Sequence, residues 1–414
     1  MLENNFVQDI QISPRVLCWA QIKPNKKGSF EDYLWAMSKE AKKRHWRFIL
    51  CVLGPINPQL NLELQGSGCE IVYLTQEQSQ DPWHLIKLLH QYKINILHTH
   101  FIGPTDFILL MSRCFWGGKI VVTDHSSNPL IPALTPCLLK RKLQTVKRLT
   151  FSYCINLYLP VSGFVAQRIC SNIPLAQHKI HRLYNGIDLN RFKPCDTYIE
   201  KQSLKSELMA LNDDKPIVSF IGQLITEKGI HLCLNVIGKL LKEQKNFHFF
   251  IIGDGEQRPL VEAFYKEHPY KEYIHILGSR SDVDDILRIT DMLLMPSLWG
   301  EAFGLTAAES IASAVPVIAS DIGGIPEVVQ HNYSGILIPV NNEKELELSI
   351  QYLLASPDDR VQMGINGRAH ALEYFSLDKM IEQTYAYYET LFSVPPTQSP
   401  NIFINKTTSS PGSK

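Results

Sequence analysis

"MLLMPSLWGEAFGLTAAESIASAVPVIAS", residues 292–320, holds two short apolar runs with a helical pattern between them. The runs at 292–297 and 315–320 are typical of buried strands, because each is a short apolar segment bounded by turn-forming residues. The small and apolar residues from Gly304 onward favour a helix. A strand, a helix and a second strand in this order predict a parallel βαβ unit.

The same alternation continues in both directions along the chain. Further apolar runs typical of buried strands occur at 15–20, 47–54, 70–75, 94–100, 119–125, 155–162, 216–222, 247–253 and 273–278. Amphipathic stretches such as 81–93 separate them, and the pattern restarts after the polar, proline-containing connection 185–201. The predicted fold class is therefore α/β, with two Rossmann-like, doubly wound domains that face each other across a cleft.

The pattern also predicts the domain limits. We place the first domain at residues 1–190 and the second at 191–372. An amphipathic helix at 373–392 is expected to pack back on the first domain. Residues 393–414 are rich in Pro, Ser, Thr and Asn, which is the composition of a disordered tail.

Composition indicates a globular enzyme. The 414 residues are 45% hydrophobic and 20% charged, which is ordinary for a soluble protein. No uncharged apolar run reaches the length of about 18 residues that a transmembrane helix needs, and the N-terminus lacks the basic and apolar regions of a signal peptide. Nine cysteines occur singly with no CxxC pair, which fits a reducing compartment. We therefore expect a cytoplasmic protein.

The zero net charge conceals an asymmetry. Residues 1–194 contain 23 Lys and Arg against 12 Asp and Glu, a net charge of +11, so the remainder carries −11. Either the basic half faces an anionic partner, such as the inner face of a membrane, or the two halves match each other. The basic stretch 138–151 fits both an amphipathic segment on anionic lipid and a solvated helix. No nucleic-acid partner is expected.

Two loops that follow predicted strands carry residues suited to a phosphate. Ligands of open α/β sheets bind beyond the carboxyl ends of the strands. The strand at 216–222 ends at Gly222, which permits close backbone approach, and Lys228 follows with a positive charge. The strand at 247–253 ends similarly at Gly253. Both loops can also be ordinary turns with a solvated lysine, and without GxGxxG or a Walker lysine motif a dinucleotide or ATP site lacks support.

Two carboxylates, Glu301 and Glu309, bracket an uncharged turn. A helix that begins near Gly304 presents free N–H groups and a positive dipole end, which together form an anion site. Carboxylates accept hydrogen bonds from paired hydroxyls, so the arrangement suits a ligand with sugars on both sides of a phosphate. An acid in the first turn at 301 and an exposed helix residue at 309 explain the same residues equally well.

These segments resemble glycosyltransferase family 4, which has the GT-B fold and a Glu-x7-Glu motif. The similarity covers residues 296–329, and "FIGQLITEKG", "IIGDGEQRPLVEA", "LYNGID", "LPVSGFVAQ" and "VVTDHSS" resemble further family elements in the expected order. The resemblance implies a retaining glycosyltransferase. Its donor is a nucleotide-sugar, its acceptor is a glycan, a lipid or a small molecule held by the first domain, and it needs no cofactor besides the donor substrate.

The resemblance also implies roles for individual residues. Glu301 would bind the donor sugar, His125 would lie near that sugar, and Lys228 would neutralise the departing diphosphate; these three are the catalytic candidates. Glu309 would bind the ribose hydroxyls. The implied donor-binding residues are Gly28, Gly222, Gln223, Lys228, Gly253, Phe303, Gly304, Leu305 and Glu309.

Two departures from the family pattern keep other functions open. Gln223 stands where the family often has arginine, so diphosphate binding would be weaker or shared with another cation. The N-terminal loop usually has paired glycines but reads "KPNKKGSFEDY" at 23–33, where Lys26 and Lys27 could compensate. The alternatives are a catalytically silent GT-B subunit that binds partners, and a GT-B epimerase or phosphorylase. No motif carboxylate is an obvious covalent nucleophile, so retention would proceed by front-face attack within an ion pair.

Two patterns resemble metal sites. Asp282 and Asp284 match the DxD by which other glycosyltransferases hold Mn²⁺, but their position favours a helix N-cap with an acidic first turn. His98 and His100 on one strand face, with Asp124 and His125 at the end of another strand, could bind zinc, although a polar cleft lining explains them better. We expect no metal site and metal-independent chemistry.

Overall fold

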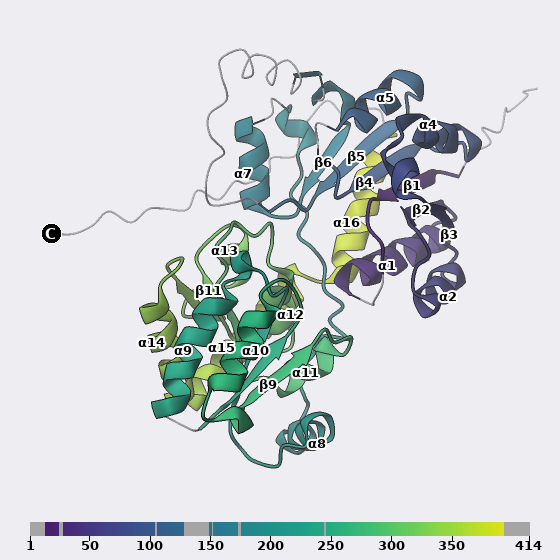
Figure 1. Ribbon diagram of the computed structural model, residues 1–414. Coiled ribbons are helices and arrows are strands. Elements are labelled where there is room, and N and C mark those ends of the chain that lie inside the picture. The colour runs from purple at the N-terminus through teal and green to yellow at the C-terminus, as the bar shows by residue number, and fades with distance from the viewer. Residues whose placement is uncertain are drawn as a thin grey trace, which may run out of the picture.

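The computed structural model describes residues 13–24, 28–103, 106–127, 149–150, 152–172, 175–243 and 246–392. These residues form two α/β domains that lie one beyond the other (Figure 1). The predictions for Lys26, Lys27, most of the basic stretch 138–151 and the tail 393–414 concern residues outside these ranges.

The first domain is built on six parallel strands in the order β3-β2-β1-β4-β5-β6. The strands are β1 (Arg15–Ala20), β2 (Arg47–Leu53), β3 (Glu70–Leu74), β4 (Ile96–His100), β5 (Lys119–Asp124) and β6 (Leu157–Pro160). The helices are α1 (Ser29–Lys43), α2 (Pro58–Gly66), α3 (Gln76–Gln80), α4 (Pro82–Gln91), α5 (Phe107–Phe115) and α7 (Gly163–Asn172). The central strands are continuous apolar runs because helices cover both faces of a parallel sheet.

The second domain repeats this topology, with the strand order β12-β11-β10-β7-β8-β9. Its strands are β7 (Ile217–Ile221), β8 (His248–Ile252), β9 (Ile274–Gly278), β10 (Met292–Met295), β11 (Val317–Ser320) and β12 (Gly335–Ile338). Its helices are α8 (Tyr198–Met209), α9 (Ile230–Glu243), α10 (Arg258–Glu267), α11 (Val283–Ile289), α12 (Leu305–Ala312), α13 (Ile325–Val328), α14 (Glu343–Ala355) and α15 (Pro357–Tyr374). Two doubly wound sheets confirm the predicted fold class. The sequence prediction missed β12, an edge strand that begins with a glycine.

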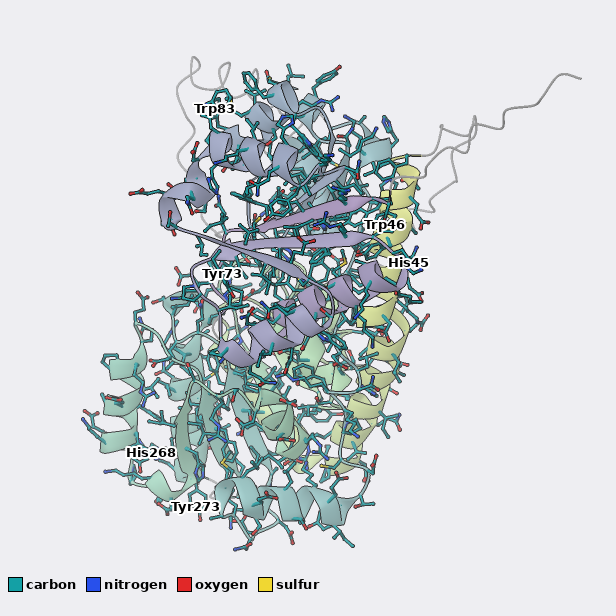
Figure 2. All side chains as sticks on the ribbon, turned by 90° about the vertical axis from the view of Figure 1, so that its right-hand side faces the viewer. His45, Trp46, Tyr73, Trp83, His268 and Tyr273 are labelled. Carbon is teal, nitrogen blue, oxygen red and sulfur yellow. The ribbon has the colours of Figure 1, made fainter. Side chains whose placement is uncertain are left out.

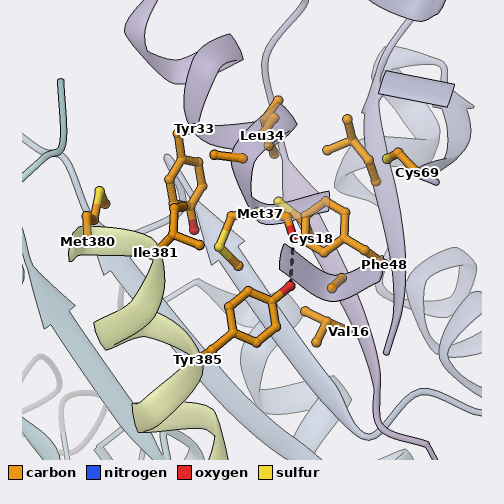
Figure 3. Close-up of a cluster of buried hydrophobic side chains, with 14 of the residues drawn as sticks. Val16, Cys18, Tyr33, Leu34, Met37, Phe48, Cys69, Met380, Ile381 and Tyr385 are labelled. Carbon is orange, nitrogen blue, oxygen red and sulfur yellow. Dashed lines mark hydrogen bonds between the residues drawn. The ribbon is translucent and has the colours of Figure 1, made fainter. Parts of the chain in front are cut away.

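The last helix of the described residues, α16 (Leu377–Thr390), lies against the first domain beside α1 (Figure 1). Its side chains Met380, Ile381 and Tyr385 enter a buried cluster with residues of β1 and α1 (Figure 3). The Tyr385 hydroxyl donates to the Met37 carbonyl oxygen at 2.7 Å. The chain therefore leaves the first domain, builds the second and returns.

Both sheets reverse their strand order beside their first strand, between β1 and β4 and between β7 and β10. Helices leave opposite faces of the sheet on either side of such a switch point, and this opens a crevice at the carboxyl ends of the strands. The two crevices supply the loops of the cleft described next.

Candidate active site

A cavity of about 620 Å³ lies between the two domains and is lined by residues from both. Every residue that the resemblance implied as a catalytic or donor-binding candidate lies on its wall: Gly28, His125, Gly222, Gln223, Lys228, Gly253, Glu301, Phe303, Gly304, Leu305 and Glu309. Apart from Gly28 and His125 these come from the second domain. The fold thus brings together residues that are up to 281 positions apart in the sequence.

The loop after β8 packs against the loop after β7 with no room for a side chain. Gly253 has φ +138°, and a Cβ at this position would lie 1.8 Å from the carbonyl oxygen of Gly222. Glycine is required at 253 for both reasons. Because of this contact the backbone itself forms the wall of the cavity.

Glu301 is a buried carboxylate with one oxygen held by three donors. Its Oε1 accepts hydrogen bonds from Lys228 Nζ at 2.6 Å, from Ser297 Oγ at 2.9 Å and from Trp299 Nε1 at 2.9 Å. Lys228 and Glu301 therefore form one ion-paired unit, whereas the sequence analysis gave them separate ligands. Among the described residues no donor is recorded for Oε2, so this oxygen remains available.

Glu309 lies on the cleft side of α12 and is half-buried, so it is not the exposed helix residue of the alternative interpretation. Its Oε1 accepts a hydrogen bond from the Ser29 hydroxyl at the start of α1, in the first domain. Burial raises the pKa of Glu309 to about 7, against a smaller opposing effect of the Ser29 hydrogen bond. The carboxylate is thus poised between its neutral and ionised forms at neutral pH.

The helix that carries Glu309 begins where the sequence predicted. Gly304 is its N-cap with φ +95°, and α12 starts at Leu305. Within the described part of the chain, no protein acceptor is recorded for the N–H groups of Phe303, Gly304 and Leu305. Such groups and the helix dipole favour an anion. The buried Phe303 ring packs edge-to-face on Phe375, with centroids 5.3 Å apart, and anchors this turn.

His125 belongs to a group of aromatic rings at the ends of β4 and β5. Its Nε2 lies 3.1 Å from His100 Nδ1, and its ring stacks on Phe101 with centroids 4.7 Å apart. Burial lowers the pKa of His125 to about 4, so the imidazole is neutral at physiological pH. His98 does not line the cavity, and its ring nitrogens contact the hydroxyls of Tyr388 and Thr123.

The DxD-like pair is bound to arginine. Asp282 occupies the predicted N-cap of α11, but its carboxylate accepts from Arg280 Nε at 2.8 Å and caps no helix N–H. Asp284 accepts from Arg191 Nη2 at 3.3 Å. The described residues contain no group of three or more His, Cys, Asp or Glu that could hold a metal ion.

Sequence reasoning missed two cations of the cleft, Arg191 and Arg280. Arg191 joins the domains, since it also donates to Asp32 Oδ2 in α1 at 2.9 Å. It lies in the stretch interpreted as a polar connection, where no periodicity marks it. Both arginines line the same cavity as Gln223.

Two doubly wound domains that face each other across a cleft are the arrangement of the GT-B fold. Residues 31–191 match the family described as "Glycosyltransferase Family 4", and residues 203–370 match "Glycosyl transferases group 1". The chain belongs to this family of glycosyltransferases. The family resemblance inferred from the sequence is therefore confirmed.

Two curated relatives illustrate the similarity. The chain is 25% identical over 304 residues to an alpha-D-kanosaminyltransferase of Streptomyces kanamyceticus, covering 71% of this chain and 77% of the relative. It is 29% identical over 216 residues to an Escherichia coli UDP-Gal:alpha-D-GlcNAc-diphosphoundecaprenol alpha-1,3-galactosyltransferase, covering 51% and 54%. Among the relatives compared, the matched stretch spans from 46% to 88% of the relative's own length.

Solved structures share the fold over nearly the whole chain. A glycosyltransferase from Rickettsia africae superposes with a TM-score of 0.76 at 21% identity, covering 92% of this chain and 99% of that one. An Anabaena protein in complex with UDP-glucose gives a TM-score of 0.71 at 15% identity, covering 91% and 99%. In the described ranges of the present chain, no helix is long and apolar enough to cross a membrane.

Proposed function

We propose that the protein transfers a hexose from a UDP-sugar to a sugar-containing, lipid-linked acceptor with retention of the anomeric configuration. The observation that carries this proposal is the order of groups along one wall of the cavity: the Lys228–Glu301 pair, the start of α12 and then Glu309. This order matches a sugar, a diphosphate and a ribose in sequence. The UDP-glucose complex of the Anabaena protein supports the donor class, and the name of the Escherichia coli relative supports the acceptor class.

The proposed roles follow from the geometry. Glu301 Oε2 would accept hydrogen bonds from the donor sugar, and neutral His125 faces that sugar from the first domain. Leaving-group charge develops on the diphosphate, where Lys228 and the N–H groups at the start of α12 can stabilise it. No metal is needed in this scheme, because these cationic and dipolar groups carry out the charge stabilisation. Gln223 would contribute one neutral contact, with Arg191 and Arg280 as further cations.

Retention is the first expected outcome. The attacking hydroxyl would enter on the face from which the diphosphate leaves, since the scheme contains no carboxylate nucleophile. The product made from an α-linked UDP-hexose should therefore show an α-anomeric proton in its NMR spectrum. A β-linked product would contradict the front-face scheme. Absence of both transfer and hydrolysis across donors would favour the catalytically silent subunit, and release of an epimerised sugar would favour the epimerase.

Removal of the ion pair is expected to lower turnover strongly without unfolding the protein. Lys228→Ala and Glu301→Gln each remove charge stabilisation or orientation at the reacting centre, so kcat should fall by about 10²–10³-fold. The matched control is Lys239→Ala. Lys239 lies on the exposed side of α9, where it pairs with Glu347. Turnover measurements compare kcat among the three variants, and circular dichroism checks that each is folded. Near-normal kcat in Lys228→Ala would remove this residue from the mechanism.

Donor affinity is expected to depend on the protonation of Glu309. Ribose hydroxyls donate to the ionised carboxylate. Because the pKa of Glu309 is about 7, only part of the protein carries the ionised carboxylate that binds the donor below neutral pH. The dissociation constant of UDP-glucose should therefore be about tenfold weaker at pH 6 than at pH 8. Titration calorimetry across this range measures the effect. The profile of Glu309→Gln should be flat, and a flat profile in the wild type would contradict the ribose role.

A membrane location is proposed together with the lipid-linked acceptor. Trp83, Phe107 and Phe115 on α4 and α5 are 51–57% exposed, and Trp83 lies at the end of the first domain remote from the second (Figure 2). Exposed aromatic rings in a basic domain suit an anionic lipid interface. Sedimentation with phosphatidylglycerol vesicles should be salt-sensitive and weaker for Trp83→Ala than for Trp35→Ala, a control on α1. Equal sedimentation with neutral vesicles would contradict binding to an anionic lipid surface.

A further inference from the structure

The residue after Glu301 is held by the first domain on both sides of its backbone. The carbonyl oxygen of Ala302 accepts a hydrogen bond from Ser162 Oγ at 2.5 Å, and the Ala302 N–H donates to Ser127 Oγ at 3.2 Å. Ser127 follows β5, two residues after His125, and Ser162 lies between β6 and α7. Two serines of the first domain therefore bind one residue of the second.

A second contact fixes the direction of the Ser162 hydrogen bond. Ser162 Oγ also accepts from the Val165 N–H at 3.1 Å, as an N-cap side chain does at a helix start. A serine hydroxyl has a single proton, and this proton is free to be donated to Ala302. Ser162 is fully buried, so it holds α7 and Ala302 together in a place from which water is excluded.

A carboxylate of the second domain strengthens the same junction. Glu327 in α13 accepts from the N–H groups of Gly163 at 2.7 Å and Phe164 at 2.8 Å, at the start of α7. A helix leaves these first N–H groups unpaired, and a negative charge there is favourable to its dipole. Figure 1 shows α13 at the edge of the second domain that faces α7. The start of α7 is thus bound by both Ala302 and Glu327.

On its other side, the segment that carries Glu301 contacts the backbone of Gly324. The Gly324 N–H donates to the Glu301 carbonyl oxygen at 2.8 Å. A Cβ on Gly324 would lie 2.5 Å from the Ala302 carbonyl oxygen, so the two backbone segments leave no room for a side chain between them. The segment that carries Glu301 therefore has little freedom to shift between these contacts.

We propose that Ser127, Ser162 and Glu327 are positioning residues for sugar transfer, which hold Glu301 of the second domain at a fixed place relative to His125 of the first. The inference rests on the proposed function, because it needs both residues to face the donor sugar. The proposed nucleotide contacts lie mainly in the second domain, so loss of these bonds changes the geometry of transfer while UDP still binds. Misplacement by about 1 Å at a reacting centre can cost about 10²-fold in rate.

Kinetics of serine variants test this assignment. In Ser127→Ala, kcat should fall by about tenfold or more while the dissociation constant of UDP changes by less than about twofold. Ser127→Thr keeps the hydroxyl and should restore most of the rate. Ser126→Ala is the matched control, since this neighbouring serine is exposed and lies outside the cavity wall. Unchanged kcat in Ser127→Ala, or equal losses in kcat, UDP affinity and thermal stability, would overturn the proposal.

A second readout does not require turnover. The Ala302 amide is protected by its bond to Ser127, so hydrogen exchange of a peptide covering residues 300–304 should be faster in Ser127→Ala than in the wild type or Ser126→Ala. Glu327→Gln, which replaces one acceptor oxygen by an amide, should act in the same direction. Unchanged exchange would overturn the positioning role even if kcat fell. Wild-type protein that transfers no sugar would contradict the proposed function alone, and the exchange measurement would still decide whether the junction exists.

Discussion

The ion pair between Lys228 and Glu301 is the contact on which the second domain's side of the cleft depends. A buried carboxylate is stable only when donors compensate for its lost hydration, and Glu301 obtains three donors on one oxygen. One of them comes from a different loop, so the two loops must approach closely. Gly229 permits this approach, because a Cβ at this position would lie 2.1 Å from the Pro296 carbonyl oxygen. The burial of the Glu301 charge thus constrains the backbone conformation of both loops.

Among the described residues, the Lys and Arg side chains on the cavity wall are all paired with carboxylates. Lys228 is paired with Glu301, Arg191 with Asp32 and Asp284, and Arg280 with Asp282. A diphosphate that enters this cavity would compete with these carboxylates for the same donors. In the proposed reaction, the withdrawal of Lys228 toward phosphate would leave Glu301 Oε1 with the Ser297 and Trp299 donors alone, so binding of one part of the donor would loosen the contacts of the carboxylate that receives the next.

The sequence alone predicted what depends on local periodicity and on a sequence motif. Strands buried on both faces are unbroken apolar runs, so β1 and β7 were readily found, and Gly304 marked the start of α12. Contacts between distant parts of the chain leave no such pattern. The Ser29 hydroxyl and Glu309 are 280 residues apart, and the partners of Arg191 depend on how two domains meet. Asp282 was placed at the correct helix end, but its choice of Arg280 over the helix N–H groups is a matter of tertiary geometry.

The return of α16 to the first domain affects the order in which the protein can fold during synthesis. Tyr385 and Tyr388 are fully buried in the first domain's core, yet the ribosome makes them after the whole second domain. The usual order, in which the N-terminal domain is complete first, cannot apply. At about 5–20 residues per second, the apolar surface between α1 and β1 that receives α16 stays uncovered for roughly ten seconds or longer. The domain made first is therefore completed only after the second, once α16 has emerged from the ribosome.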